Sequence, residues 1–159
     1  MSTMRVGHGF DVHPFSDDGS RPLVLGGQHF PGERALAGHS DADVLAHAVA
    51  DAILGAAGLG DLGTHFPDTD PAWKGADSMR LLARVVSLAG DAGWIVGNVD
   101  VTVVAEAPKL APHRAAIEEN MTAAVGAPVS VKATRAEGLG SLGRREGIAC
   151  FAVVLLERT

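Results

Sequence analysis

The sequence predicts a single α/β domain (an α+β sandwich), in which helices cover one face of a mixed four-stranded sheet and a small hairpin is added. Three observations favour this fold class. Segments with the alternation of strands are interspersed with segments of helical period. No internal repeat or linker divides the chain, so residues 1–159 are expected to form one domain. The length is also sufficient for a core that is stable unaided.

The first half of the chain contains a strand, a hairpin and a long helix. After a lead-in over residues 1–3, the expected elements are a strand over 4–10, a polar turn over 16–19, a hairpin over 23–30 and a helix over 39–57. Gly26 and Gly27 suit the hairpin turn because glycine tolerates positive φ. The helix reads as helical from Asp41 onward, and Ser40 or Asp41 is a natural N-cap. Residues 58–71 are rich in Gly, Pro and Asp, which predicts a loop without regular structure.

The second half alternates helices and strands. Its expected elements are a helix over residues 78–92 with Gly93 as its stop, a half-buried strand over 99–103, a helix over 112–125, and strands over 130–133 and 148–156. Helices that cover only one face of the sheet leave the other face polar or in contact with a partner. The valines at 99, 101 and 103 and the apolar last strand point to a partner on that face.

Composition and charge exclude several classes of protein. The formal charge is −6, from 13 basic and 19 acidic residues, and no basic run or basic aromatic face suggests a nucleic-acid partner. No apolar run reaches membrane-spanning length, and no targeting signal precedes Arg5, so no membrane partner is expected. The single cysteine, Cys150, allows no internal disulfide, which favours the reducing cytoplasm.

The long helix carries a row of ionisable residues. Asp43, His47 and Asp51 recur every fourth residue and therefore share one face. His39 and Ser40 lie at the positive end of this helix, where backbone N–H groups favour an anion. Metal ligands and an anion site on one element suggest phosphate chemistry. The alternative for such a pattern is a solvated polar stripe.

A second cluster lies near the start of the chain. Asp11 and His13 are two residues apart, so on an extended segment both side chains leave the same side. His47 is a natural third ligand. Two histidines and one carboxylate leave a coordination position open for water or substrate, which is the catalytic zinc pattern. The chain has seven histidines, so chance matches are a competing explanation.

Two further segments suggest ligand binding. Residues 106–109 follow a strand directly, at the edge where α/β sheets hold ligands. Residues 132–147 combine glycines with Lys132, Arg135, Arg144 and Arg145, so backbone N–H groups and positive charge are available for phosphate. This segment lacks the order of a P-loop, and a flexible solvated hairpin is the alternative.

Several motifs, in one order along the chain, resemble a known family. They are Gly7-His8-Gly9-Phe10-Asp11-Val12-His13, Gly38-His39-Ser40-Asp41-Ala42-Asp43-Val44, Gly60-Asp61-Leu62-Gly63, Phe66-Pro67-Asp68-Thr69-Asp70-Pro71 and Gly143-Arg144-Arg145-Glu146-Gly147-Ile148-Ala149. Over residues 5–156 the chain is similar to the 2-C-methyl-D-erythritol 2,4-cyclodiphosphate synthase family. That resemblance implies a phosphorus–oxygen lyase of non-mevalonate isoprenoid precursor biosynthesis. Its members convert 4-diphosphocytidyl-2-C-methyl-D-erythritol 2-phosphate to the cyclic diphosphate and release CMP.

The resemblance also implies cofactors, partners and site residues. Asp11, His13 and His47 would bind one Zn²⁺ per subunit, and Glu137 would hold Mg²⁺ or Mn²⁺ on the substrate diphosphate. His39 and Arg135 are the expected catalytic residues. Family members are homotrimers with active sites between subunits, and their partner molecule is a cytidine diphosphate-linked substrate. The expected substrate-binding residues are Asp11, Val12, His13, His39, Ser40, Asp61, Leu62, Gly63, Phe66, Pro67, Asp68, Thr69, Asp70, Ala105, Glu106, Ala107, Pro108, Lys109, Leu110, Ala111, Thr134, Arg135, Ala136, Glu137, Ser141 and Arg144.

The chain departs from the family pattern at a few positions. Arg135 and Ala136 replace two threonines of the family's Thr-Thr-Thr-Glu run, and Phe151 stands where some members carry a Glu on the trimer axis. Two rival functions also fit part of the pattern. An iron oxygenase could use the same two histidines and carboxylate, but the phosphate-type loops speak against it. A non-catalytic trimeric nucleotide-binding module would not need all three metal ligands.

Overall fold

The computed structural model describes residues 2–159, so Met1 of the expected lead-in lies outside the described residues. Its four-stranded sheet has the order β1-β6-β4-β5, in which β4 and β5 are parallel and the other pairs antiparallel. The strands are β1 (Met4–Pro14), β4 (Trp94–Val104), β5 (Val129–Thr134) and β6 (Gly147–Arg158). The predicted mixed sheet is confirmed, although its strands are longer than the alternating segments alone suggested.

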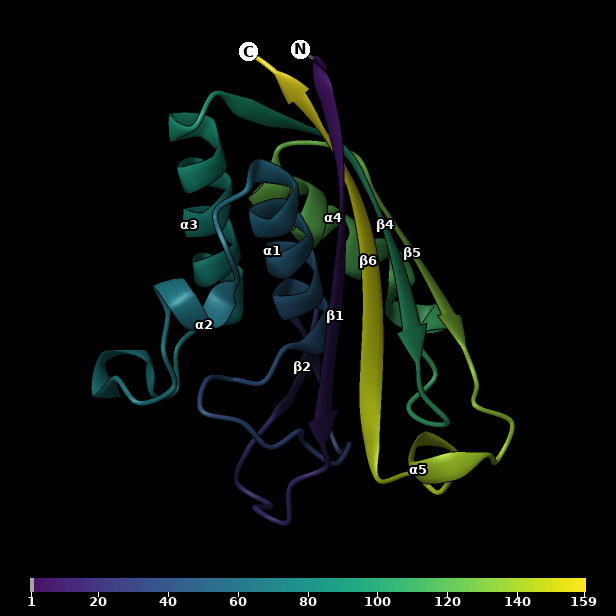
Figure 1. The fold of residues 1–159 in the computed structure, drawn as a ribbon. Coiled ribbons are helices and arrows are strands. Elements are labelled where there is room, and N and C mark those ends of the chain that lie inside the picture. The colour runs from purple at the N-terminus through teal and green to yellow at the C-terminus, as the bar shows by residue number, and fades with distance from the viewer. Residues whose placement is uncertain (1) are drawn as a thin grey trace.

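Three long helices cover one face of this sheet (Figure 1). They are α1 (Val44–Ala57), α3 (Ser78–Asp91) and α4 (Arg114–Val125). Helix α1 lies in the centre, against β1 and β6, with α3 at its side. The predicted hairpin is formed by β2 (Leu23–Leu25) and β3 (Gln28–Phe30), and Gly26 and Gly27 at its turn have φ of 58° and 72°.

Two glycines of β1 allow α1 to lie directly on the strand. A Cβ atom on Gly9 would stand 1.8 Å from the carbonyl oxygen of Ala48, and one on Gly7 would stand 2.0 Å from that of Ala52. Real Cβ atoms do not approach backbone oxygens so closely, because packed interiors leave no such overlap. The missing side chains therefore set the distance between β1 and α1.

Helix α1 begins later than predicted. Its N-cap is Asp43, not Ser40 or Asp41, and residues 39–43 form an irregular segment in which Ala42 has φ of 60°. The Asp43 carboxylate is fully buried and accepts hydrogen bonds from the backbone N–H groups of Gly26 and Gly27, each at 2.8 Å, as well as from the first helical turn. These contacts with the hairpin turn select Asp43 among the possible caps.

The prediction of a loop without regular structure over residues 58–71 is wrong. The segment contains the short helix α2 (Leu62–His65), followed by the 3₁₀ turn η1 (Pro71–Trp73). Asp61 caps α2 and Asp70 caps η1 through side-chain hydrogen bonds, so the aspartates that suggested a loop are N-caps. Two further short elements are η2 (Ala111–His113) and α5 (Gly140–Gly143).

The open face of the sheet is apolar, but not where the valines of β4 predicted. Val99, Val101 and Val103 are 0–1% exposed because they point into the core beneath the helices. On β1 and β6, the exposed large apolar side chains of the open face are Met4, Val6, Phe10, Val12, Phe151 and Val153. Alternation along a strand gives two faces but does not say which one the helices cover. Over residues 2–159, no helix is both long enough and apolar enough to span a membrane.

Candidate active site and metal centre

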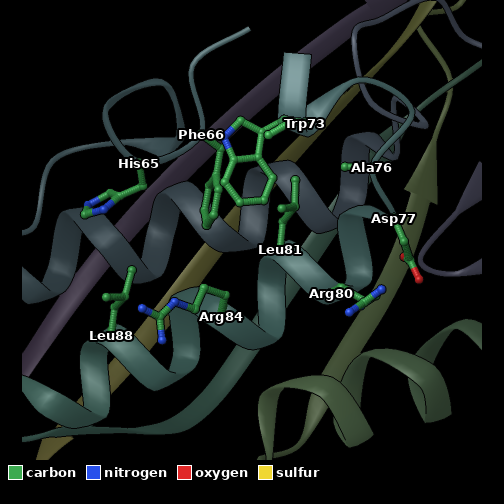
Figure 2. Close-up of a pocket in the computed structure, with 10 residues that line it drawn as sticks. His65, Phe66, Trp73, Ala76, Asp77, Arg80, Leu81, Arg84 and Leu88 are labelled. Carbon is green, nitrogen blue, oxygen red and sulfur yellow. The ribbon is translucent and has the colours of Figure 1, made fainter. Parts of the chain in front are cut away.

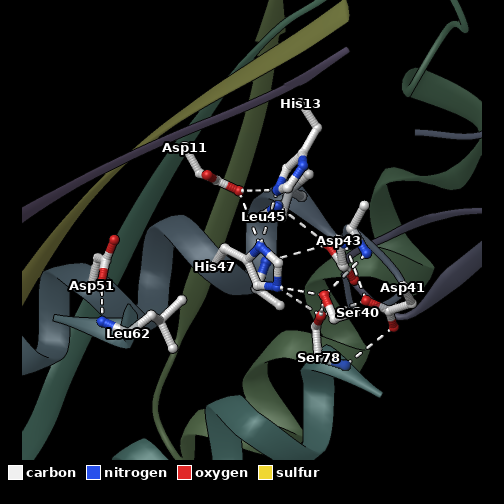
Figure 3. A network of polar contacts seen from close by, with 12 residues as sticks. Asp11, His13, Ser40, Asp41, Asp43, Leu45, His47, Asp51, Leu62 and Ser78 are labelled. Carbon is white, nitrogen blue, oxygen red and sulfur yellow. Dashed lines mark hydrogen bonds and ion pairs between the residues drawn. The ribbon is translucent and has the colours of Figure 1, made fainter. Parts of the chain in front are cut away.

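The residues predicted as zinc ligands converge in the structure. Oδ2 of Asp11 lies 2.9 Å from Nε2 of His13 and 3.1 Å from Nδ1 of His47. The two imidazole nitrogens are 3.2 Å apart. Figure 3 shows the three side chains facing one another, Asp11 and His13 from β1 and His47 from α1. Among residues 2–159, this is the group of His, Cys, Asp and Glu whose ligand atoms could share one metal ion.

Strand alternation and the close approach of α1 explain this convergence. Gly7, Gly9, Asp11 and His13 occupy alternate positions of β1, so all four face the helix. The two glycines lie against the backbone of α1. His47, in the first turn of that helix, therefore faces Asp11 and His13 as β1 continues past the glycines.

The outer nitrogens of both histidines are held by neighbouring oxygens. Nδ1 of His13 lies 2.8 Å from the carbonyl oxygen of Ala37, and Nε2 of His47 lies 2.8 Å from Oγ of Ser78. A carbonyl only accepts hydrogen bonds, so Nδ1 of His13 carries a hydrogen; in the neutral ring this leaves Nε2, which faces the cluster, as the nitrogen that could bind a metal. Partners of this kind orient imidazole rings at metal sites.

The pKa values of the cluster show how strongly its members interact. Burial raises the pKa of Asp11, but the hydrogen bonds and charges of His13 and His47 outweigh burial and bring this pKa to about 2. Burial lowers the pKa of His13, whereas the hydrogen bond and charge of Asp11 raise it by more. The carboxylate therefore stays ionised, and a bound cation would be attracted to it. A carboxylate and two imidazoles are ligands that suit zinc and related divalent metals.

The metal cluster lines a cavity of about 350 Å³. Predicted substrate-binding residues in its wall are His39, Ser40, Leu62, Phe66 and Asp68. The wall also contains residues without an assigned ligand role in the sequence analysis, namely Gly38, Asp51, Trp73 and Leu81. Nε2 of His39 lies 3.1 Å from the carbonyl oxygen of Asp70, which links this histidine to the segment 66–73 in the wall of the cavity.

A second cavity, of about 590 Å³, adjoins the metal cavity and is also lined by the segment 66–73. Phe66, Trp73 and Leu81 line both, and they form the wall between them. The rings of Phe66 and Trp73 meet edge to face, with centroids 4.9 Å apart. Figure 2 shows the two rings standing above α3, near Leu81. A single layer of apolar side chains, those of Phe66, Trp73 and Leu81, therefore separates the two cavities.

Comparison with known proteins identifies the family. The model of the YgbB family matches residues 4–157. The chain belongs to the YgbB family. The 2-C-methyl-D-erythritol 2,4-cyclodiphosphate synthase of Geotalea uraniireducens is 58% identical over 158 residues, which are 98% of this chain and 99% of the relative. The family resemblance predicted from the motifs is confirmed.

Solved structures of relatives share the fold. A CDP complex of IspF from Plasmodium falciparum has a TM-score of 0.86 at 32% identity, over 100% of this chain and 99% of that one. The bifunctional IspDF of Campylobacter jejuni has a TM-score of 0.93 at 42% identity, over 98% of this chain. The chain spans 42% of the length of that bifunctional protein.

In this YgbB family chain, the predicted site residues of segments 105–111 and 134–144 lie in a different place. Glu106, Ala107 and Pro108 line a separate cavity of about 180 Å³. Arg135 binds Glu106 through Nε and Nη2, at 3.1 and 2.9 Å from Oε2, and the N–H of Ala136 donates to Oε1 at 2.8 Å. The segments 105–111 and 134–144 thus contact each other, at the lower end of β4 and β5 in Figure 1.

Individual residues of these segments differ in their surroundings. Arg144 pairs with Glu146, with 2.6 Å between Nε and Oε2. Glu137, the predicted ligand of the second cation, has φ of 55°, and the adjacent Ala136 and Arg135 are held by Glu106. A positive φ on a residue with a side chain is strained and is retained where the surroundings enforce it. Val12 points to the open face of the sheet, because alternation places it opposite Asp11 and His13.

Proposed function

We propose that the chain converts 4-diphosphocytidyl-2-C-methyl-D-erythritol 2-phosphate to 2-C-methyl-D-erythritol 2,4-cyclodiphosphate and CMP. In this reaction an oxygen of the 2-phosphate bonds to the β-phosphorus. The bond between that phosphorus and the oxygen leading to CMP breaks, and CMP leaves with the electron pair. The observation that carries the proposal is the convergence of Asp11, His13 and His47 in one cavity with His39 and Ser40. Relatives that bear the name of this activity are 54–58% identical over nearly the whole chain, which supports it.

The donor set favours zinc as the metal at this centre, one ion per subunit. Asp11, His13 and His47 would hold it, with a position left open for a phosphate oxygen. When bound, such an ion polarises the phosphate and offsets the negative charge that develops during transfer. Following the family resemblance, we assign Glu137 to a second cation, Mg²⁺ or Mn²⁺, on the substrate diphosphate; a carboxylate is a ligand that suits such hard cations.

The residues of the chain position the substrate and need no general base. The attacking phosphate oxygen is already ionised at neutral pH, so orientation and charge stabilisation are the main requirements. His39 and Ser40, beside the metal ligands, would bind a phosphate group. The segments 61–63 and 66–70 would hold the ribose and the erythritol portion, and Phe66 would help to exclude water. Residues 105–111 and 134–137 would bind the cytidine with its phosphates, and Ser141 and Arg144 would add ligand contacts.

We further propose a homotrimer in which neighbouring subunits complete each active site. Glu106, Ala107 and Pro108, in the segment 105–111 assigned to cytidine, line a cavity other than the metal cavity of the same chain. The open face of the sheet also exposes six large apolar side chains on β1 and β6, as expected of a surface covered by another subunit. The CDP complex of the Plasmodium falciparum relative supports a cytidine-linked substrate. The single free cysteine, Cys150, fits the cytoplasm.

The decisive experiment measures CMP release from the authentic substrate, before and after removal of metal by a chelator. Chelation should lower the rate by on the order of a thousandfold, which corresponds to the several kcal/mol that a metal supplies. Zinc added back should restore the rate, and anomalous scattering should place one ion at Asp11, His13 and His47. The variant His47→Ala should lose both the ion and the activity. A metal-free protein with undiminished CMP release would refute the proposal.

Shared sites can be tested by mixing two inactive variants. His47→Ala removes a metal ligand, and Glu137→Gln alters the residue that we assign to the second cation. If each site takes these residues from different subunits, a randomly mixed trimer has about a quarter of its sites intact, because each half is intact with a probability of one half. Refolding the variants together should restore activity, and light scattering should give three chains per particle. A monomer, or a mixture that stays inactive, would exclude shared sites.

A further inference from the structure

A chain of hydrogen bonds leads from the metal cluster to a buried serine and an aspartate. Nε2 of His47 lies 2.8 Å from Oγ of Ser78, and this hydroxyl is bonded in turn to Oδ1 of Asp41. The backbone N–H of Ser78 donates to the other carboxylate oxygen of Asp41 at 3.1 Å. Ser78 is 0% exposed. Figure 3 shows Ser78 and Asp41 on the side of His47 that faces away from Asp11 and His13.

The chemistry of these groups fixes the direction of each bond. An ionised carboxylate only accepts, so the single hydroxyl hydrogen of Ser78 goes to Asp41. Towards His47 the hydroxyl oxygen can then only accept, which requires a hydrogen on Nε2 of the imidazole. A neutral imidazole with its hydrogen on Nε2 has its lone pair on Nδ1. That lone pair faces Asp11 and His13, where a metal ion needs it.

Ser40 is the other hydroxyl near this nitrogen, but it is less suited to the role. Its Oγ lies 3.2 Å from Nε2 of His47, farther than that of Ser78, and it accepts a hydrogen bond from the N–H of Ala42. Ser78 is also better anchored, since both its hydroxyl and its N–H are bonded to Asp41.

We propose that Ser78 and Asp41 are positioning residues for the metal, which hold His47 in the tautomer that binds the ion. The proposal rests on the metal centre assigned above. The same pair also links residue 41 to the chain that leads into α3. Ser78 begins α3, and the N–H of Asp41 donates to the carbonyl oxygen of Ala76 at 3.1 Å. Loss of a residue that orients a metal-bound histidine typically weakens metal binding about 10- to 100-fold.

The test measures metal binding itself. Zinc affinity is determined by chelator competition on the full chain, and cobalt is substituted for zinc because its visible absorption reports the ligand geometry. Ser78→Ala and Asp41→Asn should each weaken zinc binding by about 10- to 100-fold and alter the cobalt spectrum. Ser78→Thr keeps a hydroxyl and should recover most of the affinity.

Asp43→Asn is the matched control for lost stability. Asp43 is buried at the start of α1, the helix of His47, and its carboxylate accepts from four backbone N–H groups but contacts no side chain of the metal ligands. This variant should lower the melting temperature while zinc affinity and the cobalt spectrum stay unchanged. Ser78→Ala protein with wild-type affinity and spectrum would overturn the positioning role. Wild-type protein that binds no cobalt at His47 would instead overturn the metal centre, so the two failures are distinguishable.

Discussion

The metal cluster and the Glu106–Arg135 region are built on different principles. In the metal cluster, the side chains of Asp11, His13 and His47 are only 14–23% exposed, and each has its partners within the same chain. In the other region the Arg135 side chain is 62% exposed, although Glu106 beneath it is 3% exposed. The first region is preorganised by β1 and α1 packing together. The second is held by an ion pair that solvent screens, so a ligand or a neighbouring subunit can rearrange it.

The largest expected effect in this comparison comes from the exposed region. Arg135 stands at a threonine position of the family pattern and would stabilise charge on the phosphates, although here it binds Glu106. If Arg135 leaves Glu106 and binds the substrate phosphates during the reaction, Arg135→Ala should lower kcat about a hundredfold, as loss of a charge-stabilising donor does. Arg135→Thr should recover much of the rate. Steady-state CMP release measures both variants.

Glu106→Gln is the control for this exchange. It keeps the size of the side chain but removes the charge that holds Arg135, so kcat should not fall by as much as in Arg135→Ala. An Arg135→Ala enzyme with unchanged kcat and KM would mean that Arg135 serves only its ion pair.

A smaller effect tests the preorganisation of the metal cluster. Gly9→Ala would place a Cβ 1.8 Å from the carbonyl oxygen of Ala48, so α1 must move away from β1 and carry His47 with it. Overpacking of this kind costs about 1–3 kcal/mol, or roughly 3–10 °C in melting temperature for a chain of this size. Zinc affinity should fall about tenfold, as when a residue that orients a ligand is lost. Calorimetry and chelator competition measure the two effects.

Gly55→Ala is the matched control on the same helix. A Cβ there meets nothing within 4 Å, and alanine is a better helix former than glycine. This variant should be slightly more stable, with unchanged zinc affinity. A Gly9→Ala protein that behaves like Gly55→Ala would show that the contact between strand and helix does not set the geometry of the cluster.

The smallest effect concerns the pH dependence of stability at Asp51, in the wall of the metal cavity. Burial raises the pKa of Asp51, and the charges of Asp61 and Asp11 add to this rise, against the hydrogen bond from the N–H of Leu62. The ionised form is therefore disfavoured by folding, and the cost grows as pH rises from the unfolded pKa of about 3.9 through the raised folded pKa. Asp51→Asn removes this cost and keeps an oxygen for Leu62.

Urea denaturation of the metal-free protein measures this difference. The stability of Asp51→Asn relative to wild type should increase between pH 4 and pH 7, by less than about 1 kcal/mol, as expected of a half-buried site. A relative stability that falls with pH would show that the ionised carboxylate stabilises the fold.

Local patterns predicted the elements, while contacts between distant segments decided their limits. Helical period and alternation located α3, α4 and the strands, because these signals are contained in a few neighbouring residues. The start of α1 was missed because Ser40, Asp41 and Asp43 can all cap a helix. The hairpin turn, more than ten residues away, made the choice by donating to Asp43. Likewise, helices from other parts of the chain determine which face of β4 is buried.

The candidate site divides in the same way. Asp11, His13 and His47 could be predicted because their spacing carries the chemistry. Ser78, Trp73 and Leu81 could not, since each belongs to a segment whose local pattern reads only as helix or loop. Ser78 is the first residue of α3 and has no motif around it; only the packing of α3 beside α1 brings its hydroxyl to His47.

The pairing of β1 with β6 has a consequence during protein synthesis. Within residues 2–159 the only strand beside β1 is β6, and Pro14 lies opposite Gly147, so even the nearest paired residues are 133 positions apart in sequence. At ribosomal rates of about 5–20 residues per second, β1 waits roughly 7–30 seconds for its neighbour. During that time its backbone N–H and C=O groups lack a strand partner. The edge of the strand that carries Asp11 and His13 is therefore paired late, and a chain stalled before residue 147 would expose an unpaired strand edge that can associate with other chains.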